Sequence, residues 1–148
     1  MRPLAARALT YIDTSVWCAY CFNEPETPAA ARWLADADLD RTATALWTHT
    51  EFSSATGIKL RSKGQTRAAV ARARQAFESA VVMAHQLDAV AEDFLSAAEL
   101  CRASPVKLRA GDALHLAIAL RHNCQALASL DQDMASAAQR LGLHVTVF

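Results

Sequence analysis

The run Ala8-Leu9-Thr10-Tyr11-Ile12-Asp13 decides the fold that we expect, because a short apolar segment ends there at an acid, just before a helix begins. The same arrangement returns near the C-terminus, where Asp131 and Asp133 follow the apolar run 126–130. A short, continuous apolar run is typical of a buried parallel strand. Parallel strands end at one shared edge of the sheet, where α/β folds bind ligands, so we expect these acids to lie together.

Two further acids occupy comparable positions. Glu51 lies a few residues beyond the run 42–45, and Asp112 opens the strongly apolar segment 113–120. Carboxylates crowded at one edge repel one another unless they share a cation. An oxygen-rich site with few nitrogen or sulfur ligands favours Mg²⁺ or Mn²⁺. The chemistry that fits such a site is metal-assisted attack of water on a phosphodiester.

Each acid also has a purely structural explanation, and the sequence leaves it open. Asp13 could cap the helix that follows it, and Asp131 or Asp133 could cap the last helix of the chain. Glu51 could complete a capping box with Thr48. For any single site capping is the commoner role, so the interpretation as a metal site depends on the whole set.

The composition describes an ordered domain without a strong charge. The chain has 148 residues, 53% of them hydrophobic, with 15 basic and 15 acidic side chains. This length predicts a single domain over residues 1–148. Zero net charge argues neither for nor against a nucleic-acid partner. Between residues 52 and 77, however, there are six basic residues and no acid, which fits either a solvated helical face or a track for phosphates.

Other classes of protein find little support. No apolar stretch reaches the roughly 20 residues of a membrane span, and residues 1–7 lack the apolar core of a signal peptide, so we expect a cytoplasmic protein without membrane contact. Cys18 and Cys21 have the spacing of a redox dithiol. Cys101 and Cys124 are isolated and complete no zinc site. Buried, reduced cysteines are the preferred interpretation.

Short apolar runs alternate with helical patterns along the chain, which predicts an α/β fold with a short parallel sheet flanked by helices. The predicted strands are 9–12, 41–45, 81–83, 127–130 and 145–148. The predicted helices are 15–22, 28–37, 48–61, 66–79, 88–101, 110–122 and 134–141. We expect helix 110–122 to be central because it is the most apolar. Helix 88–101 is expected to bury one face, formed by Val90, Phe94, Leu95 and Ala98.

Four motifs resemble those of PIN-domain ribonucleases. Tyr11-Ile12-Asp13-Thr14-Ser15-Val16 resembles the opening strand of the family, and Thr50-Glu51-Phe52 its helix-borne glutamate. The segment AGDALHLA (110–117) resembles the third acidic motif, and ASLDQDM (128–134) resembles the fourth. Their order and separations match over nearly the whole chain. The resemblance implies a PIN-like α/β/α sandwich.

Within that family the chain looks like the VapC toxins of type II toxin–antitoxin systems. This resemblance implies an endoribonuclease that depends on Mg²⁺ or Mn²⁺, is inhibited by a cognate VapB-like antitoxin, and forms a homodimer. The catalytic and metal-binding residues implied are Asp13, Glu51, Asp112 and Asp131, with Asp133 as a further metal ligand. Supporting hydroxyls are expected from Thr14, Ser15 and Ser129, the last at a position where the family more often has threonine. RNA contacts are expected from Lys59, Arg61 and Lys63. We assign His115, inside an apolar helix, a packing role and no catalytic one.

Two other classes of function remain open. The chain could be a PIN nuclease that processes RNA or cleaves DNA without being a toxin, and a neighbouring antitoxin gene would distinguish the two. It could also be a non-catalytic interaction module, although such a module would gain nothing from clustered like charges. Helices at 28–37 and 48–74 carry more apolar surface than a small sheet can cover. We expect one part of that surface to pair two copies and another to receive an antitoxin helix.

Overall fold

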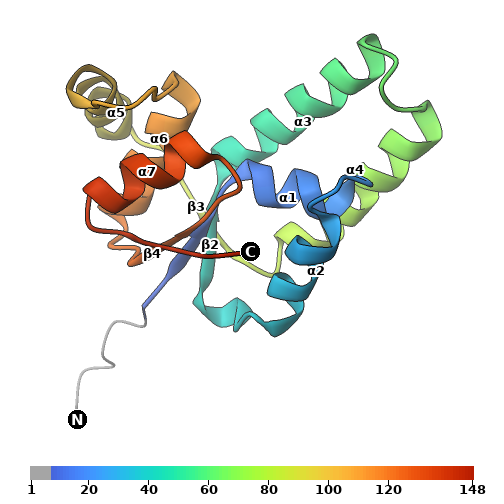
Figure 1. The fold of residues 1–148 in the computed structure, drawn as a ribbon, viewed down its shortest axis with the longest axis horizontal. Helices are drawn as coiled ribbons and strands as arrows, with labels where there is room; N and C mark the ends of the chain where they lie inside the picture. The colour runs from blue at the N-terminus through green and yellow to red at the C-terminus, as the bar shows by residue number, and fades with distance from the viewer. Residues whose placement is uncertain (1–7) are drawn as a thin grey trace.

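The computed structural model describes residues 8–148, which form a five-stranded, fully parallel sheet with the strand order β3-β2-β1-β4-β5 (Figure 1). The strands are β1 Thr10–Ile12, β2 Thr42–Ala45, β3 His85–Leu87, β4 Ala126–Ala128 and β5 His144–Val145. The helices of this part of the chain are α1 Thr14–Cys21, α2 Thr27–Asp36, α3 Leu46–Arg61, α4 Arg67–Val81, α5 Ala91–Ala103, α6 Ala110–Arg121 and α7 Gln132–Arg140, with a short 3₁₀ turn at Leu39–Arg41.

The alternation of side chains along the strands produces two hydrophobic cores. In β1, Tyr11 packs with residues of α5, α6 and α7 on one face of the sheet. Its neighbour Ile12 packs with residues of α1, α2, α3 and α4 on the other face. Successive residues of a strand point to opposite faces, so a buried strand feeds both layers. The predicted α/β/α sandwich is confirmed.

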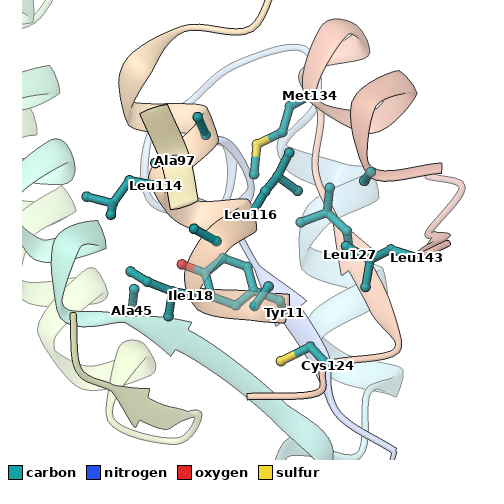
Figure 2. Close-up of a cluster of buried hydrophobic side chains, with 14 of the residues drawn as sticks. Tyr11, Ala45, Ala97, Leu114, Leu116, Ile118, Cys124, Leu127, Met134 and Leu143 are labelled. Carbon is teal, nitrogen blue, oxygen red and sulfur yellow. The ribbon is translucent and has the colours of Figure 1, made fainter. Parts of the chain in front are cut away.

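Helix α6 is the centre of the first core, as its composition predicted. Every residue from 113 to 119 is buried. Leu116 and Ile118 are fully enclosed, and they lie near Tyr11 and Leu127 in Figure 2. A helix that is apolar around its whole circumference must be covered on all sides. This rigid position fixes the first turn of α6, where Asp112 lies.

Two predicted strands are misplaced. Helix α4 continues to Val81, which is buried, and the next strand is His85–Leu87, not 81–83. At this edge of the sheet only Leu87 is buried, so β3 has almost no hydrophobic signal. The last strand is His144–Val145, earlier than the predicted 145–148. It too lies at an edge, where side chains need not be apolar.

Helix α3 begins at Leu46, two residues before its predicted start. Thr48 therefore lies inside the first turn, where its buried hydroxyl lies 3.0 Å from that of Thr44. The alternative explanation of Glu51 as part of a capping box with Thr48 is excluded, because Ala45 is the N-cap. Glu51 is thus free of a capping role.

The predicted buried face of α5 is also wrong. Phe94 is 55% exposed and Leu95 is 71% exposed, whereas Asp93 and Ala97 are buried. Asp93 turns inward because Arg121 of α6 binds it, with Nε 2.8 Å from Oδ1 and Nη2 3.0 Å from Oδ2. An ion pair, which a hydrophobic pattern does not record, sets the rotation of this helix.

No helix within residues 8–148 is both long and apolar enough to cross a bilayer. The expectation about a signal peptide concerns residues 1–7, which lie outside the described part of the chain.

Candidate active site

Asp13 lies at the centre of the site, where β1 ends and α1 begins. Its backbone N–H donates to the carbonyl of Ala128 in β4 at 3.1 Å, which continues the pairing of the two central strands. Its Oδ1 accepts hydrogen bonds from the backbone N–H of Ser15 at 3.1 Å and from the Ser15 hydroxyl at 2.6 Å. The Ser129 hydroxyl donates to Oδ2 at 3.0 Å. Asp13 therefore caps α1, which was one of the explanations that the sequence left open, and it also belongs to a polar cluster.

Asp131 approaches from the adjacent strand. Its Oδ1 accepts from the backbone N–H of Met134 at 2.9 Å, so it caps α7. Its own N–H donates to the Ser129 hydroxyl at 3.0 Å. Ser129 thus joins the carboxyl ends of β1 and β4, one acid on each side. The backbone N–H of Leu130 secures the same edge by donating to the Ser15 hydroxyl at 2.9 Å.

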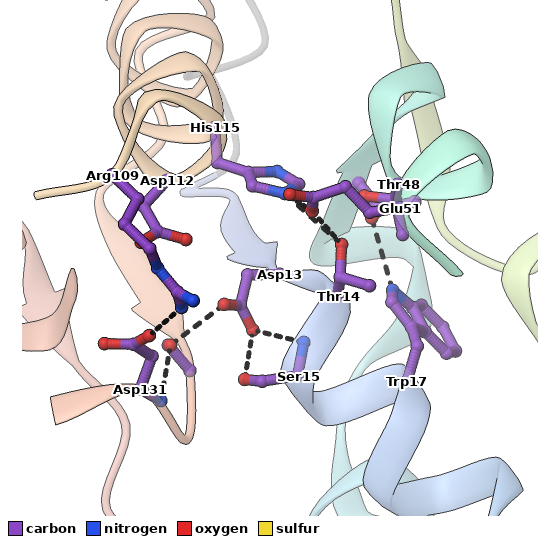
Figure 3. A network of polar contacts seen from close by, with 12 residues as sticks. Asp13, Thr14, Ser15, Trp17, Thr48, Glu51, Arg109, Asp112, His115 and Asp131 are labelled. Carbon is purple, nitrogen blue, oxygen red and sulfur yellow. Dashed lines mark hydrogen bonds and ion pairs between the residues drawn. The ribbon is translucent and has the colours of Figure 1, made fainter. Parts of the chain in front are cut away.

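Asp112 lies in the first turn of α6 beside Asp131, and one arginine connects the two. Arg109 Nε donates to Asp112 Oδ2 at 3.2 Å, and Nη2 donates to Asp131 Oδ2 at 3.1 Å. Figure 3 shows the guanidinium between these two carboxylates, with Asp13 beside them at the start of α1. Asp112 and Asp131 are largely covered, with side-chain exposures of 14% and 23%.

Glu51 enters from α3, on the opposite side of Asp13 (Figure 3). The Thr14 hydroxyl donates to its Oε2 at 2.5 Å. His115 Nε2 hydrogen-bonds to the same oxygen, and the Tyr11 hydroxyl lies 2.6 Å from His115 Nδ1. In a neutral ring, Nδ1 can accept a hydrogen bond from the tyrosine hydroxyl while Nε2–H donates one to the carboxylate. Burial and the negative charge of Asp13 raise the pKa of Tyr11, which keeps its hydroxyl a donor.

Gly111 lets α3 and α6 approach each other at this point. A Cβ at position 111 would lie 2.6 Å from Glu51 Oε1, closer than such atoms come in folded proteins. A side chain at this position would force the Glu51 carboxylate to shift. The glycine before Asp112 therefore keeps the two acidic motifs in contact.

The four acids share one edge of the sheet but differ in their electrostatics. Burial raises the pKa of Asp13 to about 6, against the effect of His115 and the two serine hydroxyls. Burial also raises the pKa of Asp112, which the charge of Arg109 opposes. For Glu51, hydrogen bonds from His115 and Thr14 outweigh burial and lower the pKa. The N-termini of α1, α6 and α7 point to this edge, and their dipoles favour anions there.

Some predicted residues lie outside the cluster. Asp133 is exposed in the first turn of α7 and, within the described residues, makes no polar contact with the four acids. Lys59 is partly buried, with Nζ 2.7 Å from Glu24 Oε1 and 4.8 Å from the centre of the Phe22 ring. Arg61 and Lys63 are exposed at the end of α3.

Cys18 and Cys21 lack the lowered pKa that a reactive dithiol has. Burial raises the pKa of Cys18, which the charge of Glu24 reinforces, to about 12. Burial likewise raises the pKa of Cys21 to about 12. Reactive thiols have a lowered pKa because the thiolate is the nucleophile. This pair has the opposite property, and both of its side chains are partly buried.

Three contributors were missed by sequence reasoning. His115 is packed as predicted, with 1% exposure, but its ring also binds Glu51. Tyr11, read only as a strand residue, supports that ring through a hydroxyl 104 positions away in the chain. The sequence held one indication of the role of Arg109, because this residue precedes Asp112 by three positions, the spacing of a helical ion pair. Its contact with Asp131 depends on the fold.

Asp13 should make the metal-free protein less stable as the pH rises. A folded-state pKa of about 6 exceeds the unfolded value, so the folded protein holds the proton longer between pH 4 and 6. The free energy of unfolding falls across this window and stays low above it. The free energy of unfolding of Asp13→Asn, taken relative to that of wild type, should therefore rise by up to about 3 kcal/mol between pH 4 and pH 7. Urea unfolding in EDTA measures this difference, and a constant difference over that range would contradict the prediction.

Comparisons with known proteins agree with this fold. Among solved structures, the VapC20 toxin of Mycobacterium tuberculosis, described as cleaving the sarcin-ricin loop, matches with 23% identity and a TM-score of 0.66, over 86% of this chain and 94% of that one. The FitAcB structure from Neisseria gonorrhoeae matches with 16% identity and a TM-score of 0.67, over 94% of this chain and 97% of that one.

VapBC2 from Rickettsia felis, solved with a promoter DNA fragment, matches with 10% identity and a TM-score of 0.62, over 93% of this chain and 97% of that one. At these identities the matches show a shared fold. No curated protein matches the sequence. The family model of the PIN domain matches residues 10–140. With that match over most of its length, the chain belongs to the PIN domain family.

Proposed function

We propose that this protein is a divalent-metal-dependent endoribonuclease and the toxin of a VapBC-type toxin–antitoxin pair. The observation that carries the proposal is the set of four acids at the carboxyl edge of the sheet, two of which already share one cation, the Arg109 guanidinium. Membership of the PIN family and the likeness to VapC20 support it.

The residues present fit a hard divalent ion. Every anionic group at the site is a carboxylate, which is the ligand that Mg²⁺ and Mn²⁺ prefer. The guanidinium acts as a stand-in cation between Asp112 and Asp131, and the buried Asp13 would gain stability from a nearby positive charge. As they stand, no three Asp, Glu, His or Cys side chains of residues 8–148 are close enough to hold an ion together. The proposed ligands Asp13, Glu51, Asp112 and Asp131 must therefore adjust when one binds.

The protein's own groups orient these ligands. Ser15 and Ser129 hold Asp13 through three hydrogen bonds, one of them from the Ser15 backbone N–H. Thr14 and His115 hold Glu51 in a fixed orientation. A bound divalent ion would supply Lewis acidity toward the phosphodiester and the attacking water. The hydrogen-bonded carboxylates then need little reorganisation as the reaction proceeds. Asp133 is not part of the proposed set, because it makes no contact with the other acids.

The RNA path is proposed to follow α3. This helix carries Glu51 near its start and Arg61 at its end, about 15 Å further along the axis. In Figure 1, α3 and α4 project beyond the sheet as a helical hairpin. Arg61 and Lys63 are exposed and available to phosphates, whereas Lys59 already pairs with Glu24. The basic end of the hairpin thus lies several nucleotides from the acids.

The partners proposed are a second copy of this chain and an antitoxin helix. On α3, Leu46 is 52% exposed and Ile58 is 55% exposed, which leaves apolar surface for a second copy. An apolar groove of about 240 Å³ lies between α1, α2 and α4, with Tyr20, Leu34 and Met83 among its lining residues. A groove of this kind suits the apolar face of an amphipathic helix.

Asp112→Asn should lower cleavage of cellular RNA by at least about 100-fold, because it removes a charged oxygen ligand from the reacting centre. The assay compares total RNA incubated with wild type or variant in Mn²⁺ and in EDTA. The matched control is Asp133→Asn, a neighbouring exposed acid, which should retain activity within about twofold. Cleavage that persists in EDTA, or an Asp112→Asn variant as active as wild type, would sink the metal-nuclease proposal.

The double variant Arg61→Gln/Lys63→Gln should bind RNA more weakly and with less salt dependence. Each lost phosphate contact should reduce the slope of log affinity against log salt by about 0.7 for single strands. Fluorescence anisotropy between 50 and 200 mM salt, concentrations at which such slopes are readily seen, measures both quantities. Arg41→Gln is the control, since Arg41 lies just before β2 at the opposite edge of the sheet. An unchanged slope in the double variant would remove these residues from the RNA path.

Purified protein should sediment as a dimer, and Ile58→Glu should shift it toward the monomer by placing a charge in the apolar contact. Leu95→Glu changes an even more exposed apolar residue, on α5 and outside the proposed contact, and should leave the dimer intact. A wild-type chain that remains monomeric and does not bind the product of its neighbouring gene would contradict both partner proposals.

A further inference from the structure

Arg109 is the positive charge that the structure places between two of the four acids. It occupies the N-cap position of α6, and its side chain is 71% exposed. The guanidinium reaches two acids that belong to different helices, Asp112 in α6 and Asp131 at the start of α7. Within residues 8–148, no other lysine or arginine forms an ion pair with the four acids. One exposed positive charge therefore offsets part of the negative charge at this edge.

Arg109 holds one carboxylate oxygen of each acid, and in Asp131 it is the oxygen that does not cap α7. Asp131 Oδ1 is engaged in capping α7, which leaves Oδ2, and this atom lies 3.1 Å from Arg109 Nη2. Asp112 Oδ2 lies 3.2 Å from Arg109 Nε. A guanidinium and a divalent ion cannot both occupy the space between these two atoms, because like charges at that distance repel. As long as Arg109 holds these two oxygens, they are not free to bind an ion.

A released Arg109 has an obvious new partner. Its planar fork matches two oxygens of a phosphate as well as it matches carboxylates. The side chain is exposed and anchored one residue before α6, so it can turn from the acids toward solvent without moving the helix. Substrate phosphates would approach the same edge, since the acids that hold the ion lie there.

We propose that Arg109 is a positioning residue with two alternative partners. In the metal-free protein it neutralises Asp112 and Asp131. When a divalent ion binds at those acids, Arg109 moves to a phosphate of the substrate. This inference rests on the proposed metal-dependent nuclease and adds a residue that both restrains metal binding and assists substrate binding.

The test uses Arg109→Gln, which should change two affinities in opposite directions. Mn²⁺ should bind the variant about three- to tenfold more tightly, because no guanidinium competes for Asp112 and Asp131. RNA should bind the Mn²⁺-saturated variant about three- to tenfold more weakly, because one phosphate contact is lost. Calorimetry with Mn²⁺ alone gives the first value. Anisotropy with a fluorescent phosphorothioate RNA, which resists cleavage, gives the second.

Two variants serve as controls. Arg102→Gln removes an arginine of α5 with the same 71% exposure, whose i,i+3 partner is Glu99 and not one of the four acids. Both affinities should stay at the wild-type values. Arg109→Lys keeps the charge without the fork, so Mn²⁺ affinity should lie between those of wild type and Arg109→Gln.

Opposite shifts distinguish the inference from a merely structural role, which would weaken both affinities together. The inference is overturned if Arg109→Gln binds Mn²⁺ no more tightly than wild type, or binds RNA equally well. If the opposite shifts are seen but wild type cleaves no RNA with Mn²⁺, the nuclease proposal fails while the role of Arg109 stands.

Discussion

The parallel pairing of β1 with β2 and β4 is the constraint on which the rest of the structure depends. It gives all three strands the same direction, so the segments that follow them leave from one edge of the sheet. Asp13 and Asp131 lie just beyond β1 and β4, and α3 carries Glu51 back past the end of β2. Helix α6, buried across the sheet, brings the first turn that holds Asp112. Acids that are up to 118 positions apart therefore face one another.

Such a cluster is costly, and the surrounding groups offset the cost. Buried carboxylates are stable only where hydrogen bonds or positive charge replace water. Ser15 and Ser129 supply donors to Asp13, while Thr14 and His115 supply them to Glu51. Helix capping and acidic clustering are thus not alternatives here. The N-terminal N–H groups of α1 and α7 that Asp13 and Asp131 cap also stabilise the negative edge.

Arg109 and His115 play different parts in this balance. His115 is buried and held from behind by Tyr11, so it can only orient Glu51. Arg109 is exposed and tied at one end, so it can exchange partners. In the proposed metal site, the acids must be oriented before the ion binds. A rigid neighbour, His115, and an exchangeable one, Arg109, would meet this need.

The sequence by itself determined the fold class, the central helix and most elements, because apolar periodicity records which residues must leave water. It also singled out the four acids, since their place after strands and at helix starts is local information. It misplaced β3, whose edge position needs little apolar character, and the buried face of α5, which the Asp93–Arg121 pair sets. Only the tertiary structure separated Asp133 from the cluster and brought in Tyr11, His115 and Arg109. Their roles depend on contacts between residues far apart in the chain, and no local pattern encodes a distance in space.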